Sequence, residues 1–312
     1  PAEMTSPMRL TWINIHQIYS GLSRFRDIQK KHIKPFHDIG FRVAGLMCDN
    51  NASDDDIKYV KDLWGETGLE FGPIGASGGA NFFHPDEAVA RKGKPLFRKA
   101  IEIGGRLGCT SVRFAAGSFD PTNVWGSHRE NHTQRAMDMF VAATKEFIPA
   151  AEDSGIMLCP ETTQGTIVGS IPRMKEYVDR LESKCAGVDF DPVNHMTHER
   201  IFESGRFMQC AIATLGDRIG EIHCKDVMLT PNTVLVSHID EAPMGTGELD
   251  HAALIKASDQ LEPWKPFSLE HITTIEGIKA AYDHIMEDSR KIGHEWTAPG
   301  CTREKWEKER KR

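Results

Sequence analysis

Short apolar segments alternate with longer stretches in which apolar residues recur every three or four positions. The first pattern is typical of buried strands and the second of amphipathic helices packed on a core. Strand and helix alternate eight times, which predicts a parallel sheet closed into a single (β/α)8 TIM barrel of the α/β class. The expected strands are residues 10–15, 41–48, 69–74, 110–116, 156–161, 186–191, 219–223 and 266–270.

The same pattern gives no sign of a second domain, so we expect one TIM-barrel domain over residues 1–312. Within it, residues 8–292 are the barrel and residues 293–312 a charged tail ending in a solvated helix. One long helix is expected from Thr133 to Glu152. The long stretches 117–131 and 227–248 read as loops, which at this length are usually lids or binding loops.

Four apolar segments end in a residue that can bind a metal ion. Glu161, Asp191, His223 and Glu270 follow one another along the chain at the ends of the last four predicted strands. Because the carboxyl ends of barrel strands meet at one mouth, we expect these side chains to lie close together. A set of oxygen ligands with one imidazole suits Mg, Mn or Co better than a thiolate zinc site.

Other polar residues near these strand ends are candidates for binding and proton transfer. Asp189 lies two positions before Asp191, faces the same side of its strand and is expected to be a buried, paired acid. Arg113 and Lys225 are expected either to bind substrate oxygens or to form buried ion pairs. Three histidines are further candidates. His195 is expected to be a catalytic proton donor or a hydrogen-bonding residue, His16 to contact the substrate, and His271 to donate a proton or form hydrogen bonds. Trp125, in a loop, is expected to cover one face of a sugar.

Composition and charge narrow the class of protein. The chain has 312 residues, a formal net charge of −7 and a pI near 6.1. This acidic balance lacks the basic footprint that nucleic-acid binding requires. Its 7 cysteines form no CxxC pair, which is typical of a reducing compartment. No apolar run is long enough for a membrane span and residues 1–9 contain no signal-peptide core, so we expect a cytoplasmic protein without membrane contact.

The strings CPETTQG, DFDPVNH, HCKD and SLEH, with the later GTGELD, resemble the xylose isomerase-like barrel superfamily of sugar isomerases and epimerases, to which AP endonuclease 2-like proteins also belong. The resemblance covers residues 8–292, and the ordered quartet Glu, Asp, His, Glu is its most specific part. It implies that Glu161, Asp191, His223 and Glu270 hold one divalent ion, with Mn expected and Mg or Co as alternatives. It also implies that the two glutamates act as acid and base.

The sequence departs from the ketose 3-epimerase pattern of that superfamily at one position. A histidine usually stands three residues after the metal-binding aspartate, whereas this chain has Asn194 there and His195 one position later. Endonuclease IV-type members need further metal ligands and a basic surface facing DNA. The acidic charge of this chain argues against that branch.

Taken together, the sequence predicts an enzyme that moves a proton through a metal-stabilised enediolate of a ketose-type sugar, as an isomerase or epimerase. The same intermediate can expel a leaving group. A dehydratase or lyase acting on a keto-sugar or oxidised (3-keto) glycoside, including C-glycosides, therefore stays an alternative, as does a non-catalytic sugar-binding subunit. The expected partner is a small-molecule sugar or keto-sugar. A homo-oligomer is expected, with a hetero-complex containing a small subunit as a second arrangement.

Overall fold

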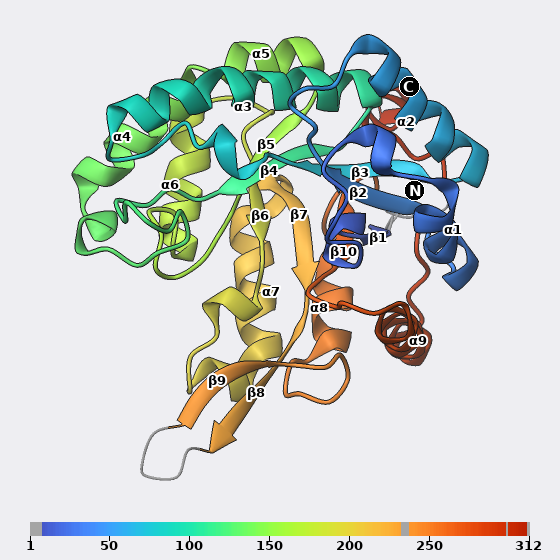
Figure 1. The fold of residues 1–312 in the computed structure, drawn as a ribbon. Helices are drawn as coiled ribbons and strands as arrows, with labels where there is room; N and C mark the ends of the chain where they lie inside the picture. Colours follow the sequence, from blue (N-terminus) through green and yellow to red (C-terminus); the bar gives the residue numbers. More distant parts are fainter. Residues whose placement is uncertain (1–7, 232–236, 298, 311–312) are drawn as a thin grey trace.

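The computed structural model describes residues 8–231, 237–297 and 299–310. Eight parallel strands close into a barrel in the order β1-β10-β7-β6-β5-β4-β3-β2 (Figure 1). This arrangement confirms the predicted α/β class and TIM-barrel fold. The barrel strands are β1 (Arg9–Trp12), β2 (Val43–Met47), β3 (Glu70–Gly75), β4 (Ser111–Ala115), β5 (Met157–Glu161), β6 (Val188–Phe190), β7 (Ile219–Cys224) and β10 (Pro266–Leu269).

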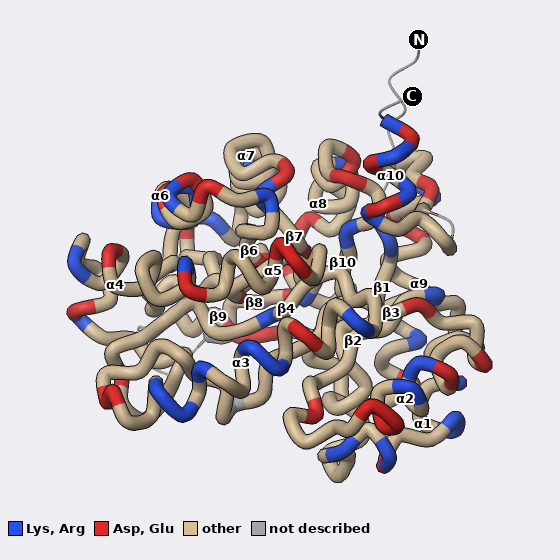
Figure 2. Tube along the Cα trace, turned by 90° about the horizontal axis from the view of Figure 1, so that it is seen from above, with Lys and Arg blue, Asp and Glu red and all other residues tan. Residues whose placement is uncertain are grey.

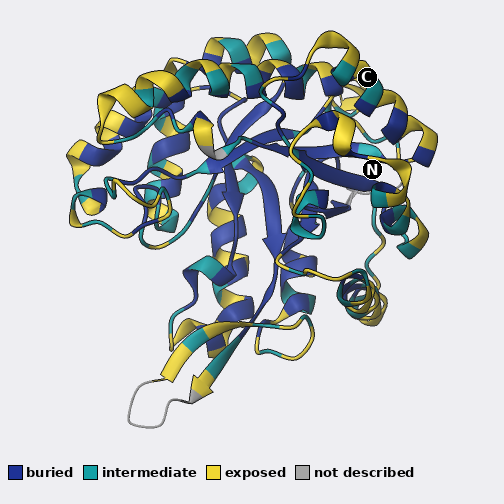
Figure 3. Ribbon diagram, viewed as in Figure 1, coloured by how far each residue is buried: buried dark blue, intermediate teal, exposed yellow. Residues whose placement is uncertain are grey.

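Helices surround the barrel and shield its strands from water. Almost every strand residue is buried, while the helices expose their outer faces (Figure 3). Parallel strands covered in this way are buried on both faces, which explains their nearly continuous apolar sequences. The helices are α1 (Lys30–Ile39), α2 (Asp54–Thr67), α3 (Glu87–Leu107), α4 (Gln134–Lys145), α5 (Ile148–Ser154), α6 (Ile171–Leu181), α7 (Ser204–Leu215), α8 (His251–Ser258), α9 (Ile275–Ile292) and α10 (Arg303–Arg310).

The outer helices carry charges of both signs side by side (Figure 2). Several of these charges pair one helical turn apart, as Lys175 does with Asp179 on α6 and Lys279 with Asp283 on α9. Each exposed pair of this kind adds only about 0.3–0.5 kcal/mol to the free energy of unfolding, so these pairs contribute little to the stability of the fold. None of the helices within the described ranges is both long and apolar enough to cross a membrane.

The stretch expected to be one helix from Thr133 to Glu152 is in fact two helices, so that prediction was wrong. Helix α4 ends at Lys145 and α5 begins at Ile148. Pro149 lies in the first turn of α5. It has no amide hydrogen to donate to the carbonyl of Lys145, which favours ending one helix and starting another here.

The stretch 227–248 was expected to be a loop, and this too needs correction. Residues 227–231 and 237–242 belong to an antiparallel hairpin, β8 (Asp226–Pro231) and β9 (Ser237–Ala242), which projects away from the barrel (Figure 1). Residues 232–236 of the expected loop lie outside the described residues. Asp226 anchors the chain that returns from it, because its carboxylate accepts hydrogen bonds from the backbone amides of Gly245 (2.9 Å) and Gly247 (2.8 Å). A Cβ atom at Gly247 would lie 2.4 Å from that carboxylate, so only glycine fits there.

The C-terminal helix α10 lies against the end of the barrel formed by the amino ends of the strands, opposite to the mouth formed by their carboxyl ends. Trp306 packs with Trp264, Cys159 and Met157, the first residue of β5. Most of the other side chains of α10 are exposed. The tail therefore contains a polar helix, which contacts the barrel through Trp306 and through the guanidinium of Arg303 over the Trp264 ring.

Candidate active site

The four predicted ligands meet at one mouth of the barrel. Glu161 is the last residue of β5, Asp191 directly follows β6, His223 lies in β7, and Glu270 directly follows β10. These strands are consecutive neighbours around the barrel. One ligand atom from each residue lies within 4.8 Å of the other three. The structure thus brings together residues that are up to 109 positions apart in the chain.

His223 is the centre of this cluster, and its ring is fully buried. Its Nδ1 atom lies 3.1 Å from Glu270 Oε2, 3.8 Å from Glu161 Oε1 and 3.9 Å from Asp191 Oδ2. Its Nε2 atom lies 2.8 Å from Asp189 Oδ2, below the cluster. A carboxylate on the far nitrogen is the usual way in which proteins fix the orientation of a metal-binding histidine. Asp189 is thus buried and paired, as expected, and its partner is His223.

Replacing Asp189 by asparagine should loosen this orientation. We expect D189N to weaken divalent-metal binding by about 10–100-fold, the usual effect of removing an outer carboxylate from a metal-binding histidine. Isothermal titration with Mn²⁺ measures the change, and thermal unfolding checks that the barrel is intact. Asp153→Asn, at an exposed position on α5, is the matched control. An affinity for Mn²⁺ equal to that of the unmodified chain would contradict this role of Asp189.

A second polar layer lies under the cluster. Glu221, two residues before His223 on β7, accepts a hydrogen bond from Ser268 Oγ (2.6 Å) and lies 3.7 Å from Arg113 Nη1. Burial opposes ionisation of Arg113, but Glu221 and the neighbouring carboxylates raise its pKa above the ordinary value. Of the two roles considered for Arg113, the structure thus shows the buried ion pair, although its side chain also borders the cavity described below.

Lys225, directly after β7, contacts two of the four clustered residues and one residue of the hairpin. Its Nζ atom lies 2.6 Å from Asp191 Oδ2, 3.1 Å from Glu270 Oε2 and 3.5 Å from Glu241 Oε1. Burial disfavours the ammonium, yet Asp191 and Glu270 raise the pKa of Lys225 and keep it charged. Glu241 comes from the hairpin strand β9. Its part in the site was missed in the sequence because the hairpin was interpreted as a loop.

The two glutamates of the cluster have opposite electrostatic environments. Burial and the nearby Glu270 raise the pKa of Glu161. Burial acts on Glu270 in the same direction, but His223 and Lys225 together hold the pKa of Glu270 well below its usual range. Two carboxylates whose pKa values are driven apart are typical of acid and base partners in enzymes.

Two properties of the cluster fit a divalent cation. First, Asp191 Oδ2, His223 Nδ1 and Glu270 Oε2 are buried, and apart from the ion pairs with Lys225 and within the cluster they have no hydrogen-bond partner in the described part of the chain. Second, the buried carboxylates outnumber the cationic side chains. These are Arg113, Lys225 and His223, whose pKa burial lowers but Asp189 and Glu270 together raise well above its ordinary value. The carboxylates are Glu161, Asp189, Asp191, Glu221 and Glu270. Unpaired buried charge is costly, and a bound cation would compensate it.

A cavity of about 300 Å³ opens beside the cluster. Glu161 and Glu270 line it, whereas Asp191 and His223 do not border it. Its opposite wall is largely apolar and includes Trp125 from the loop after β4. Trp125 is one of the few large apolar side chains that the structure exposes, at 39%. The loop aromatic predicted to cover a substrate is therefore part of the cavity wall.

Two of the three other histidine candidates, His195 and His16, hydrogen-bond to residues outside the cluster. His195 is buried, and its Nε2 atom is 3.0 Å from Thr162 Oγ1. His16 accepts a hydrogen bond from the backbone of Met47 through Nδ1. The adjacent Asn194 instead reaches the cluster, since its Nδ2 donates to Glu161 Oε1 at 3.3 Å. The position at which the sequence departs from the ketose 3-epimerase pattern is thus in contact with a proposed catalytic residue.

His271 follows Glu270 and joins the site to the hairpin. Its Nδ1 atom lies 2.8 Å from Glu241, and this contact raises the pKa of His271 above its ordinary value. Its backbone has a φ of 58°, a left-handed conformation that costs energy for a residue other than glycine. Strain of this kind is often found at functional sites.

Burial of His195 predicts an acid-sensitive step in stability. Burial, with the charge of Arg200, lowers the pKa of His195 to about 4. Between pH 6.5 and 4 the unfolded chain therefore binds a proton at this residue that the folded chain does not. The resulting stabilisation is present above pH 6.5 and is lost as the pH falls, by up to about 1.4 kcal/mol per pH unit.

The His195→Gln variant should lose that part of the pH dependence. Urea unfolding of the two chains between pH 7 and 4 measures it, and the difference between the curves removes the contribution of all other groups. The exposed His132→Gln is the control, for which we expect a curve parallel to that of the unmodified chain. Parallel curves for His195→Gln would show that this histidine titrates normally.

The closed eight-stranded barrel and its acid-rich mouth define a protein of the TIM-barrel class with its site at the carboxyl ends of the strands. Residues 33–288 match the family described as xylose isomerase-like TIM barrel. This match covers most of the chain, so the protein belongs to that family.

Several proteins of known structure or function are similar to this chain. An L-ribulose 3-epimerase from Methylomonas sp. (strain DH-1) is 25% identical over 227 residues, which is 70% of each chain. A D-allulose 3-epimerase from Methylomonas sp., solved in complex with D-allulose, has a TM-score of 0.67 at 18% identity, over 92% of this chain and 97% of that chain. A xylose isomerase-like TIM barrel protein from Mycobacterium smegmatis, solved in complex with magnesium, has a TM-score of 0.68 at 15% identity, covering 91% and 96%.

The first two of these relatives are sugar epimerases, which are enzymes of the xylose isomerase-like family. The class of enzyme expected from the sequence agrees with them. The solved structures, at these low identities, support the fold.

Proposed function

We propose that the protein is a divalent-metal-dependent sugar isomerase or epimerase that acts on a ketose-type substrate. The observation that carries the proposal is the convergence of Glu161, Asp191, His223 and Glu270 within 4.8 Å beside a cavity. The epimerase relatives support a sugar as the substrate, and the magnesium complex of a similar barrel supports a cation in such a fold.

In this proposal the four clustered residues hold one divalent ion, for which Mn is expected and Mg or Co are alternatives. The ion supplies Lewis acidity to the carbonyl and hydroxyl oxygens of the substrate. Asp189 orients His223 from below. Lys225 balances the charge of Asp191 and Glu270.

Glu161 and Glu270 carry the proton in this proposal. Glu161 is the last residue of β5 and Glu270 directly follows β10, the two outer strands of the four that form the cluster, and both residues line the cavity. Asp191 and His223 lie between them, and both are fully buried. One glutamate removes the proton from the carbon beside the carbonyl, and the other returns a proton to the opposite face. Return to the neighbouring carbon instead gives isomerisation between ketose and aldose.

Deuterium incorporation tests this proposal. The Mn-loaded protein is incubated in D2O with a panel of ketoses and followed by NMR. The expected result is deuterium at the carbon beside the carbonyl, together with a new sugar isomer. If no ketose exchanges its proton while the protein binds Mn²⁺, the proposed reaction is wrong.

A second candidate activity is cleavage of a keto-sugar or an oxidised glycoside by a dehydratase or lyase. The observation that favours it is the apolar wall of the cavity. An aromatic or aliphatic aglycone fits such a wall, formed by Phe82, Phe83, Val124, Trp125 and Phe140. In the same NMR experiment with 3-keto glycosides, release of water or of the aglycone identifies this reaction, and its absence excludes it for the substrates tested.

Assembly and location stay predictions. We expect a homo-oligomer, with a complex containing a small subunit as the alternative, and a cytoplasmic location. Light scattering of the purified chain, alone and from cells that express neighbouring genes, measures the assembly.

A further inference from the structure

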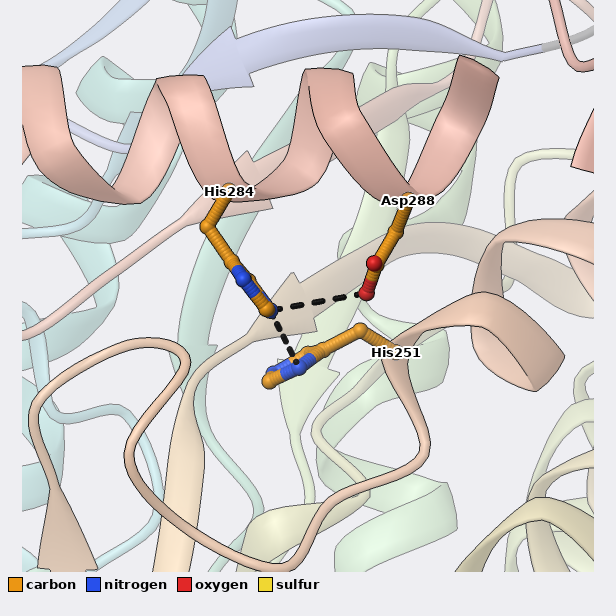
Figure 4. A group of neighbouring side chains, drawn as sticks. All are labelled: His251, His284 and Asp288. Carbon is orange, nitrogen blue, oxygen red and sulfur yellow. Dashed lines mark hydrogen bonds and ion pairs between the residues drawn. The ribbon is translucent and has the colours of Figure 1, made fainter. Parts of the chain in front are cut away.

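Two histidines and an aspartate meet outside the candidate active site, in the contact between α8 and α9 (Figure 4). His251 is the first residue of α8. His284 and Asp288 are four residues apart on α9 and therefore lie on the same face of that helix. Figure 4 shows the side chains of His284 and Asp288 pointing from α9 toward each other and toward His251.

The separations between their polar atoms approach those of a metal site. His284 Nε2 lies 3.1 Å from His251 Nδ1 and 3.5 Å from Asp288 Oδ2. One ligand atom from each of the three lies within 4.8 Å of the others. With bonds of about 2.0–2.1 Å to zinc, neighbouring ligand atoms of a tetrahedral site lie about 3.3–3.4 Å apart. Two of the three separations are therefore already close to the values that zinc requires.

The outer contacts of these residues leave the correct atoms available. His251 Nε2 lies 3.0 Å from the carbonyl oxygen of Lys225, which only accepts hydrogen bonds, so Nε2 carries the proton and Nδ1 keeps its lone pair. Asp288 Oδ1 accepts a hydrogen bond from Lys291 Nζ at 3.1 Å, which leaves Oδ2 facing His284. Metal-binding histidines and carboxylates are commonly held in this way.

We propose that His251, His284 and Asp288 form a second cation site, selective for a zinc-type divalent ion and separate from the cluster at the barrel mouth. His251 is buried, whereas the side chains of His284 and Asp288 are 28% and 14% exposed. An ion therefore has access from the solvent, and a water molecule completes its coordination. Two imidazoles and one carboxylate suit zinc better than the oxygen-rich cluster does.

Such an ion would stabilise the backbone next to the candidate active site. It would join α8 to α9, and through His251 it would fix the backbone carbonyl of Lys225. The side chain of Lys225 contacts Asp191 and Glu270. The ion therefore has a structural role two contacts away from the proposed catalytic carboxylates. Without an ion, the same geometry is a direct hydrogen bond from His284 Nε2 to His251 Nδ1.

The number of zinc ions bound per chain distinguishes a metal site from a direct hydrogen bond between His284 and His251. The chain is stripped with a chelator, dialysed against a small excess of Zn²⁺ and analysed for bound zinc by mass spectrometry of the metal. We expect two equivalents for the unmodified chain, one for His284→Ala and one for Asp191→Ala, a variant of the barrel-mouth cluster. His132→Ala, at an exposed position, is the control and should bind two.

If His284→Ala binds as much zinc as the unmodified chain, the second site is refuted. If the unmodified chain and Asp191→Ala each bind one equivalent and His284→Ala binds none, the second site stands and the proposed ion at the barrel mouth fails. Should His284→Ala not fold, Asp288→Asn takes its place with the same expected loss. As a second readout, Co²⁺ added to Asp191→Ala should give the visible absorption of a tetrahedral site, and Asp191→Ala/Asp288→Asn should lack it.

Discussion

Replacing Glu270 by glutamine is expected to lower kcat about 10²–10⁴-fold, the range that general acid–base groups contribute. Glutamine keeps the shape of the side chain but neither takes nor returns a proton. Glu161→Gln should have an effect of similar size, because the proposed reaction needs a proton-transfer group on each side of the substrate. Turnover of the ketose and deuterium uptake are measured at a Mn²⁺ concentration that saturates each variant.

Saturation with metal matters because both glutamates are also proposed ligands. A variant that has lost only metal affinity recovers kcat at high Mn²⁺, whereas one that has lost its proton-transfer group does not. Glu87→Gln, at an exposed position on α3, serves as the control and should turn over normally. Full activity of either glutamate variant at saturating metal would remove the two-carboxylate mechanism.

Lys225→Met should give the largest effect on stability, and this effect should depend on metal. The buried ammonium of Lys225 contacts Asp191 and Glu270 at 2.6 and 3.1 Å. Without it, Asp191 and Glu270 lose their buried lysine partner, and breaking a buried ion pair in this way typically costs about 3–5 kcal/mol. A divalent ion in the cluster supplies the missing positive charge. We therefore expect a strong fall in Tm for the metal-free variant and substantial recovery when Mn²⁺ is added.

Thermal unfolding of Lys225→Met with chelator and with Mn²⁺ measures both parts of this prediction. Lys256→Met is the control, since Lys256 also pairs with an aspartate but its side chain is 67% exposed. Its Tm should change little, and equally with and without Mn²⁺. A Tm of Lys225→Met that is low but insensitive to Mn²⁺ would show that the lysine matters for packing and that no cation replaces its charge.

The barrel could be predicted from the sequence because its strands are buried on both faces. Such strands give nearly continuous apolar segments, as in Ile156 to Cys159, and each is followed by a helix with a clear start or stop. Ser53 caps α2 and Gly68 ends it, and serine and glycine are residue types that often occupy these two positions. The expected helix from Thr133 to Glu152 was wrong because its apolar periodicity continues across Pro149, where backbone geometry rather than burial decides.

The ligand cluster could be predicted for a related reason. Each ligand stands at the end of a strand, and the fold alone determines that such ends converge. Glu221 had a weaker signal, since its place two residues before His223 puts it on the same face of β7. Glu241 had none. Its contact with Lys225 depends on the pairing of β8 with β9, and this hairpin is mostly exposed and lacks the apolar pattern of the barrel strands.

The closure of the barrel has a consequence for the order of events during folding. Strand β10 pairs with both β7 and β1, so it is the strand that seals the ring, and it is immediately followed by Glu270. A chain that has assembled β1 to β7 holds three of the four proposed ligands and an open edge. High-affinity capture of a cation must then wait for the last strand to dock. In a refolding experiment, binding of the metal would thus report that β10 has docked, and its binding energy would favour the closed ring over states in which that strand is undocked.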